Sequence, residues 1–212
     1  MKTDDFILAL SADAGLRGPT LGRRVALALA LGACLSLAVF MAALGARPDV
    51  NAAAHTVRFD LKFLDTLALL APAALICLRL SRPEASAGAV LAWLLAPVAL
   101  LALAVGVELA TVPAELWARK LVGTNWYHCL TLIPVFSIPP LAALILALRE
   151  GAPRYPGLTG ALAGMAAAGV SATIYATNCT DDSPLFVATW YPLATGIVAL
   201  AGWFAGRRWL RW

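Results

Sequence analysis

VALALALGACLSLAVFMAALG, residues 25–45, carries no charged side chain and sets the class of this protein. An α-helix rises about 1.5 Å per residue, so about 20 apolar residues cross the hydrocarbon core of a bilayer. Further apolar runs of similar length occupy residues 61–80, 87–106, 129–148, 158–177 and 186–206. The pattern predicts an all-α, polytopic integral membrane protein with six transmembrane helices.

The composition of the whole chain agrees with this prediction. Of its 212 residues, 61% are hydrophobic and 13% are charged, whereas soluble domains carry about 45–50% apolar and about 25% charged residues. Six spans use about 120 residues, so no separate soluble domain is expected. We expect a cytoplasmic segment at 1–24, one transmembrane domain at 25–206 and a cytoplasmic tail at 207–212.

The Lys and Arg residues predict how the helices are oriented. Loops on the cytoplasmic side of a membrane carry an excess of these residues. With a cytoplasmic N-terminus, eleven of the sixteen lie on the inner side, and the outer side holds Arg47, Arg58, Lys62, Arg119 and Lys120. We therefore expect both the N- and the C-terminus in the cytoplasm.

Charged side chains are scarce inside the apolar runs. Lys62 and Asp65 lie near the outer end of the second run, and their i,i+3 spacing predicts that they pair or extend toward the interface. We place no charge at the centre of a helix, although ion-coupled transporters generally keep ionisable groups there. This distribution counts against a small transporter, which is one alternative function.

The four cysteines fall at different depths. Cys34 is in the middle of the first apolar run, and Cys77 is near the inner end of the second. At such positions cysteine behaves as a small hydrophobic residue. Cys129 begins the fourth run and Cys179 follows the fifth, so both are expected at the outer boundary of the membrane. A pair in an oxidising compartment can form a disulfide. The spacing alone also allows two unrelated thiols.

Polar neighbours give the outer cysteines a second possible chemistry. His128 precedes Cys129, and Asp181 and Asp182 follow Cys179. Thiolates together with an imidazole suit a soft or borderline metal ion such as zinc. We take these three residues as supporting residues and leave the metal open.

The first 24 residues offer a surface for a partner. Thr3 can cap a short helix on which Phe6, Ile7 and Leu10 share one face, and Asp5 adds a negative charge to its first turn. An exposed apolar stripe of this kind can dock into a groove of a cytoplasmic protein. It can equally lie on the membrane surface.

Three segments of the chain resemble the NrsF family. They are MKTDD at 1–5 followed by Leu10, WYHC at 126–129 followed by IP at 133–134, and CTDDSPLFVATWYP at 179–192. The resemblance covers nearly the whole chain, and the 179–192 segment is the most specific part of it. Members of the family are six-span anti-sigma factors of an extracytoplasmic-function sigma factor in proteobacteria.

The resemblance implies a function without catalysis and without a cofactor. It implies that the chain, in the bacterial inner membrane, holds an extracytoplasmic-function sigma factor through its N-terminal segment and has no direct contact with nucleic acid. It also implies that Cys129 and Cys179 are a sensory pair, which we expect to respond to heavy-metal or oxidative stress. For sigma-factor docking we select Asp5, Phe6, Ile7 and Leu10.

The main alternative is a membrane thiol oxidoreductase of the quinone-linked kind that uses the same two cysteines. Such an enzyme usually passes electrons through a second cysteine pair in a CxxC motif, and the sequence contains no CxxC. An anti-sigma factor therefore remains the prediction, with the oxidoreductase and the transporter as the alternatives.

Overall fold

The protein is described by a computed structural model that covers Thr3, residues 20–85 and residues 88–211. These residues form helices and contain no strand, so the all-α prediction is confirmed. Six helical segments are long and apolar enough to cross a membrane, as predicted. They are α2 (Leu21–Ala43), α4 (Val57–Leu80), Leu91–Thr111, Ala114–Leu148, α8 (Pro156–Ala176) and α9 (Pro184–Trp209).

Two of these segments are composite. The third joins the end of the 3-10 helix η1 (Ala89–Leu94) to α5 (Leu95–Thr111), and the fourth joins η2 (Ala114–Leu116), α6 (Trp117–Val122) and α7 (Trp126–Leu148). A further short helix, α3 (Val50–Ala53), lies between α2 and α4. Most of the long helices begin a few residues earlier than the apolar runs. At α2 a polar residue caps this extended first turn, because the Thr20 hydroxyl accepts from the Arg23 amide.

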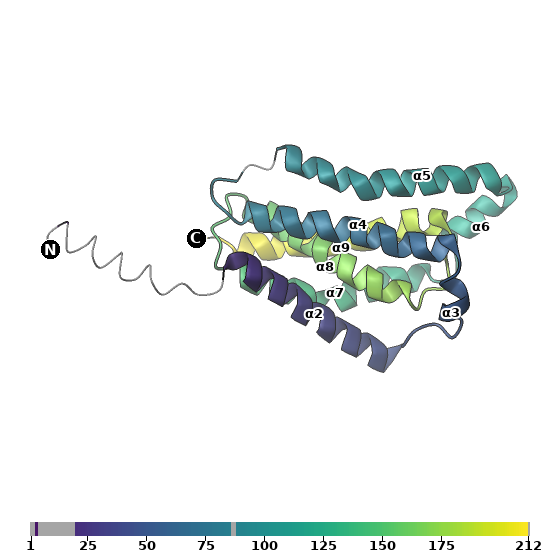
Figure 1. Ribbon diagram of the computed structural model, residues 1–212, viewed down its shortest axis with the longest axis horizontal. Coiled ribbons are helices and arrows are strands. Elements are labelled where there is room, and N and C mark those ends of the chain that lie inside the picture. The colour runs from purple at the N-terminus through teal and green to yellow at the C-terminus, as the bar shows by residue number, and fades with distance from the viewer. Residues whose placement is uncertain (1–2, 4–19, 86–87, 212) are drawn as a thin grey trace.

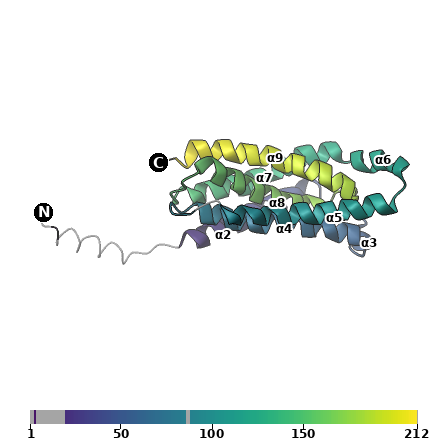
Figure 2. The same cartoon turned by 90° about the horizontal axis from the view of Figure 1, so that it is seen from above.

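The six long helices run side by side, and α2 begins at the same end of the bundle at which α9 ends (Figure 1). We call the opposite end, formed by residues 44–56, 112–125 and 177–183, the distal end. In Figure 1, α5 and α2 lie at opposite edges of the bundle, with α4, α7, α8 and α9 between them. Figure 2 shows the same layers from above.

Helix α8 forms the centre of the bundle and is the most buried of the six segments. Its small residues let α9 approach closely, as the spacing of the glycines in both helices indicates. A Cβ atom at Gly160 would overlap the backbone of Gly202 and Gly206, and one at Gly164 would overlap the backbone at Val198. These two helices therefore form a rigid pair that holds both ends of the loop 177–183.

Helix α2 packs on α7 through a contact that proline makes possible. Pro140 lacks an amide hydrogen, so the carbonyl of Phe136, one turn earlier, loses its helical partner. The Ser36 hydroxyl of α2 donates to this carbonyl at 2.7 Å, and the rings of Phe40 and Phe136 meet edge to face at 5.6 Å. Gly32 lies directly against Pro140. The α2–α7 contact thus combines close packing with a satisfied buried carbonyl.

Candidate functional site

Cys129 and Cys179 come together at the distal end of the bundle. Cys129 lies in the first turn of α7 and Cys179 in the loop 177–183 between α8 and α9, and both side chains are 0% exposed. The two thiols lie close enough to interact with each other. The Cys179 thiol donates to the carbonyl of Asp181 at 3.8 Å. Both cysteines are free thiols.

The pair is enclosed by apolar and aromatic side chains. Tyr175 of α8 and Phe186 and Tyr191 of α9 belong to the same buried cluster as the two cysteines. The Tyr175 hydroxyl is buried in this cluster without a hydrogen-bond partner among the described residues. Because this cluster shields the thiols from solvent, a reagent from outside reaches them only when the loop 177–183 opens.

Two buried cations hold the loop that carries Cys179. Lys62 of α4 is 1% exposed, and its Nζ donates to the Cys179 carbonyl at 2.9 Å and pairs with Asp182 at 2.5 Å. Arg47, which follows α2, pairs with Asp182 at 2.9 Å and with Asp49 at 2.7 Å. The predicted pairing of Lys62 with Asp65 was therefore wrong, because the loop offers Lys62 a carboxylate and a carbonyl together.

The surroundings of Cys179 favour its thiolate. The hydrogen bond from Cys129 and the positive charge of Lys62 lower the pKa of the Cys179 thiol, against the opposing effect of burial, from 9.0 to about 7. Cys179 lies between α8 and α9, outside the membrane-spanning helices. Since thiolates attack oxidants and bind soft metals, this lower pKa favours reaction at Cys179.

Asp181 fixes the other side of the loop. Its carboxylate accepts hydrogen bonds from the backbone amides of Thr124 and Asn125 at 2.9 and 2.7 Å, just before α7 begins. Burial acts to raise the pKa of Asp181, but these hydrogen bonds and those of the two side chains lower it overall. Asp181 thus joins the Cys179 loop to the start of the helix that carries Cys129.

The chain directly after α2 is bonded to the same loop. The Asn178 side chain donates to the Gly45 carbonyl at 2.9 Å, and the Arg47 amide donates to the Thr177 carbonyl at 3.0 Å. Arg47 also donates from its guanidinium to the Cys179 carbonyl at 3.3 Å. The position of this loop and the distal end of α2 are therefore coupled by backbone and side-chain contacts.

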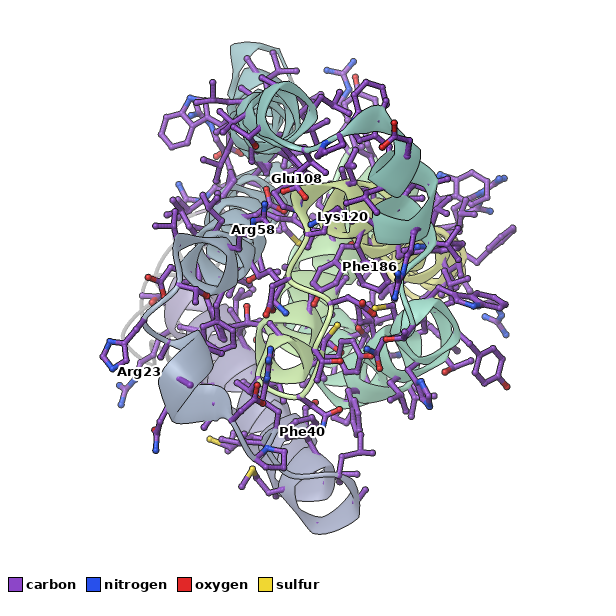
Figure 3. The ribbon with its side chains drawn as sticks, turned by 90° about the vertical axis from the view of Figure 1, so that its right-hand side faces the viewer. Arg23, Phe40, Arg58, Glu108, Lys120 and Phe186 are labelled. Atoms are coloured by element: carbon purple, nitrogen blue, oxygen red, sulfur yellow. The ribbon has the colours of Figure 1, made fainter. Side chains whose placement is uncertain are left out.

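A second ionic cluster braces the distal end nearby. Glu108 of α5 is buried and pairs with Arg58 of α4 at 3.2 Å and with Lys120 of α6 at 3.1 Å. Ser183, at the start of α9, donates to the same carboxylate at 3.2 Å. Figure 3, which looks onto the distal end, shows the three charged side chains pointing toward one another. This cluster ties α5 to the rest of the bundle.

The other predicted site residues divide into two groups. Asp181 and Asp182 lie in the thiol loop, whereas the His128 side chain is exposed and its ring lies beside Tyr127. The described part of the chain contains no group of three or more His, Cys, Asp or Glu side chains that could hold a metal ion. The docking residues Asp5, Phe6, Ile7 and Leu10 lie outside the described residues.

The sequence left the roles of Arg47, Glu108 and Tyr175 unrecognised. A signal was present for the first: Arg47 is one of only five cations assigned to the outer side, and a charge that becomes buried needs a partner. Nothing local in the sequence indicates that Tyr175 faces the thiols, because this depends on how α8 is rotated in the bundle.

Comparison with known proteins gives the family of the chain. The family model NrsF, described as negative regulator of sigma F, matches residues 10–212. The chain is 39% identical to a protein of Caulobacter vibrioides (strain NA1000 / CB15N) named Anti-sigma-F factor NrsF, over 100% of both chains. It is 34% identical, again over 100% of both chains, to a protein of Azospira oryzae (strain ATCC BAA-33 / DSM 13638 / PS) named Probable anti-sigma-F factor NrsF.

No solved structure matches the chain significantly. The family model and both relatives extend over the six apolar helices and over Cys129 and Cys179. The chain therefore belongs to the NrsF family, the negative regulators of sigma F.

Proposed function

We propose that this protein is a membrane-bound anti-sigma factor that holds an extracytoplasmic-function sigma factor at the bacterial inner membrane and releases it under heavy-metal or oxidative stress. The relatives are named as anti-sigma-F factors. The observation that carries the sensory part is the contact between Cys129 and Cys179, two buried thiols from separate segments of the chain.

The distal end faces the periplasm in this proposal, and both termini face the cytoplasm. The start of α2 and the end of α9 carry Arg23, Arg24, Arg207 and Arg208, all at the end of the bundle opposite the thiol pair. Cytoplasmic ends of membrane helices are enriched in such cations. The thiols would then lie in the oxidising compartment, where a disulfide can persist.

The sensing step is a change of bonding between the two sulfurs. An oxidant takes two electrons, each thiol loses one proton, and a bond forms between Sγ of Cys129 and Sγ of Cys179. A soft metal ion would instead displace the two protons and bind both sulfurs. Either product separates Cys179 from the hydrogen bond that its thiol donates to the Asp181 carbonyl.

The signal would cross the membrane through α2. The Cys179 loop is bonded to Gly45 and Arg47, directly after α2, so a shift of the loop moves the outer end of this helix. The Ser36 contact with Phe136 links α2 to α7, the helix of Cys129. The inner end of α2 continues into residues 1–19, which include the docking residues Asp5, Phe6, Ile7 and Leu10.

The free energy available limits how sharp the switch can be. A disulfide typically contributes about 2–4 kcal/mol, whereas moving a two-state equilibrium from 1:99 to 99:1 needs about 5.5 kcal/mol. Release by oxidation alone is therefore graded, with partial release at intermediate oxidation.

Mapping the sulfur bond tests the sensory part of this proposal. Membranes containing the full chain are treated with the thiol oxidant diamide, alkylated and digested, and the cysteine peptides are identified by mass spectrometry. A peptide pair linked through Cys129 and Cys179 is expected, with Cys34 and Cys77 alkylated as controls. If Cys129 and Cys179 remain unlinked and alkylatable while the sigma factor is released, the thiols are not the oxidant sensor.

A further inference from the structure

A cavity of about 370 Å³ lies among helices α4, α5, α8 and α9, away from the distal surface. Most of its wall is apolar, and it includes Leu69 of α4, Val98 of α5 and Met165 of α8. Four polar side chains interrupt this wall, Asp65 and Thr66 from α4 and Tyr191 and Thr195 from α9. The cavity is therefore large enough for the head of a lipophilic molecule, and its wall offers hydrogen-bonding groups.

Two of these polar side chains, Asp65 and Tyr191, have an oxygen atom without a partner in the described part of the protein. Oδ1 of Asp65 and the hydroxyl of Tyr191 are buried without a hydrogen-bond partner among the described residues. The two residues are only 8% and 3% exposed. A polar group left unpaired in a hydrocarbon environment is costly, and each specific case calls for a physical explanation. A bound polar group that both side chains contact would remove this cost.

The positions of Asp65 and Tyr191 along their helices limit which kinds of molecule can occupy the cavity. Asp65 lies about 12 Å below the first residue of α4, Val57, and Tyr191 about 10 Å below the first residue of α9, Pro184, at about 1.5 Å per residue. The rest of the cavity wall is mainly apolar, so an occupant whose polar head meets these two residues also places an apolar part against the helices. The occupant therefore needs a compact polar head that enters the hydrocarbon region together with its tail.

We propose that this cavity is a binding site for an isoprenoid quinone. A quinone has an apolar ring and tail and two carbonyl oxygens, one of which can accept a hydrogen bond from Tyr191. Its reduced form, the quinol, carries hydroxyls, one of which can donate to the carboxylate of Asp65. One donor and one acceptor facing one cavity thus suit both forms of the molecule.

The site adjoins the sensory pair without depending on its role. Tyr191 packs in the same buried cluster as Cys129 and Cys179, so the cavity adjoins the cluster that contains the thiols. Binding of a quinone is measured without the sigma factor. The result is therefore separate from the outcome of any test of sensing or release.

Saturable binding of a short-chain quinone provides the test. The purified full chain in detergent is titrated with tritiated ubiquinone-1, with unlabelled ubiquinone-1 and dioctanoyl phosphatidylcholine as competitors. We expect about one quinone per chain, displaced by unlabelled quinone and not by the phospholipid. Tyr191→Phe and Asp65→Leu each remove one hydrogen bond and should weaken binding by about tenfold.

A cavity-filling variant tests the site while every polar group remains in place. Gly196 lines the cavity, and a Cβ atom there meets no atom within 4 Å, so Gly196→Leu should fold and occupy the space. Gly106→Leu on α5 is the matched control, because Gly106 also has open space but does not line the cavity. Gly196→Leu should abolish saturable binding and Gly106→Leu should leave it unchanged.

Three results would overturn the proposal: binding that does not saturate, binding displaced equally by the phospholipid, or binding that Gly196→Leu leaves intact. The first two would indicate partition into detergent or a lipid site, and the third would place the quinone elsewhere. If Tyr191→Phe or Asp65→Leu fails to yield folded protein, Gly196→Leu decides the question alone.

Discussion

Replacing Lys62 with Met separates the two effects of this buried cation on the thiol site. Lys62 holds the loop through the Cys179 carbonyl at 2.9 Å and Asp182 at 2.5 Å, and its charge also favours the Cys179 thiolate. Met has a similar length and an apolar side chain, so it fills the same space without either effect.

The structure sets the size of the first effect. Removing one member of a buried ion pair costs about 3–5 kcal/mol. Asp182 keeps its contact with Arg47 at 2.9 Å, which places Lys62→Met at the lower end, about 3 kcal/mol. If this cost falls on the closed loop alone, opening becomes roughly 100-fold more frequent.

The second effect concerns the pH dependence of alkylation. A pKa of about 7 means that the Cys179 thiol is mainly protonated below this pH and mainly thiolate above it. The alkylation rate of wild type should therefore rise with pH and level off above about pH 7. The midpoint of this curve reports the pKa of Cys179 in the closed loop, even when the reagent reacts only with the open loop. Above the midpoint most of the protein is closed with a thiolate, so a further rise in pH no longer increases the fraction of open thiolate. In Lys62→Met the pKa rises toward 9.0, so the midpoint moves up.

Iodoacetamide labelling at a series of pH values between about 5.5 and about 9.5, with the Cys179 peptide quantified by mass spectrometry, measures both the frequency of loop opening and the midpoint of the pH dependence. Arg47→Met is the matched control, because it also loosens the loop but leaves Lys62 beside the thiol. It should react faster with the midpoint still near 7. Equal midpoints in wild type and Lys62→Met would refute the role of Lys62 in favouring the thiolate.

The remaining predictions concern topology, packing and docking. Reporters active only in the periplasm should be active when fused after Ala46 or Asp182 and silent after Trp212; activity at the C-terminus would contradict the six-span orientation. Ser36→Ala leaves the carbonyl of Phe136 without its 2.7 Å donor and should cost about 1 kcal/mol in unfolding experiments, and an unchanged stability would show that another donor replaces it. Leu10→Asp should release the sigma factor without stress while membrane insertion, measured by carbonate extraction, stays normal; retention of the partner would place docking in the inner loops.

The number and type of the helices could be predicted because both depend on local properties of the sequence. Each apolar run is long enough to span a bilayer, and in hydrocarbon a helix is the form that satisfies its own backbone. The close approach of α8 and α9 also depends on a local property, since the spacing of their glycines along each helix defines a face. Helix ends were less predictable, because the helices extend beyond the apolar runs into polar residues, as α2 does from its cap Thr20.

The thiol site was predictable only in part. Counting spans placed Cys129 and Cys179 at one level of the membrane, but their contact depends on how α7 and α8 are rotated. The partner of Lys62 was missed because the choice between Asp65, one turn away, and Asp182, in a distant loop, is decided by tertiary structure. A membrane interior penalises unpaired charge strongly, so such pairings follow the fold rather than the local sequence.

The central claim is that a change at the Cys129–Cys179 pair releases the sigma factor, and release from membranes measures this directly. Membrane vesicles carrying the full chain with its bound sigma factor are treated with diamide, and the sigma factor is quantified in pellet and supernatant. Wild type, Cys34→Ser and Cys77→Ser should release it, whereas Cys129→Ser and Cys179→Ser should retain it with normal binding before treatment. Full release by the Cys129→Ser/Cys179→Ser double variant would contradict the claim.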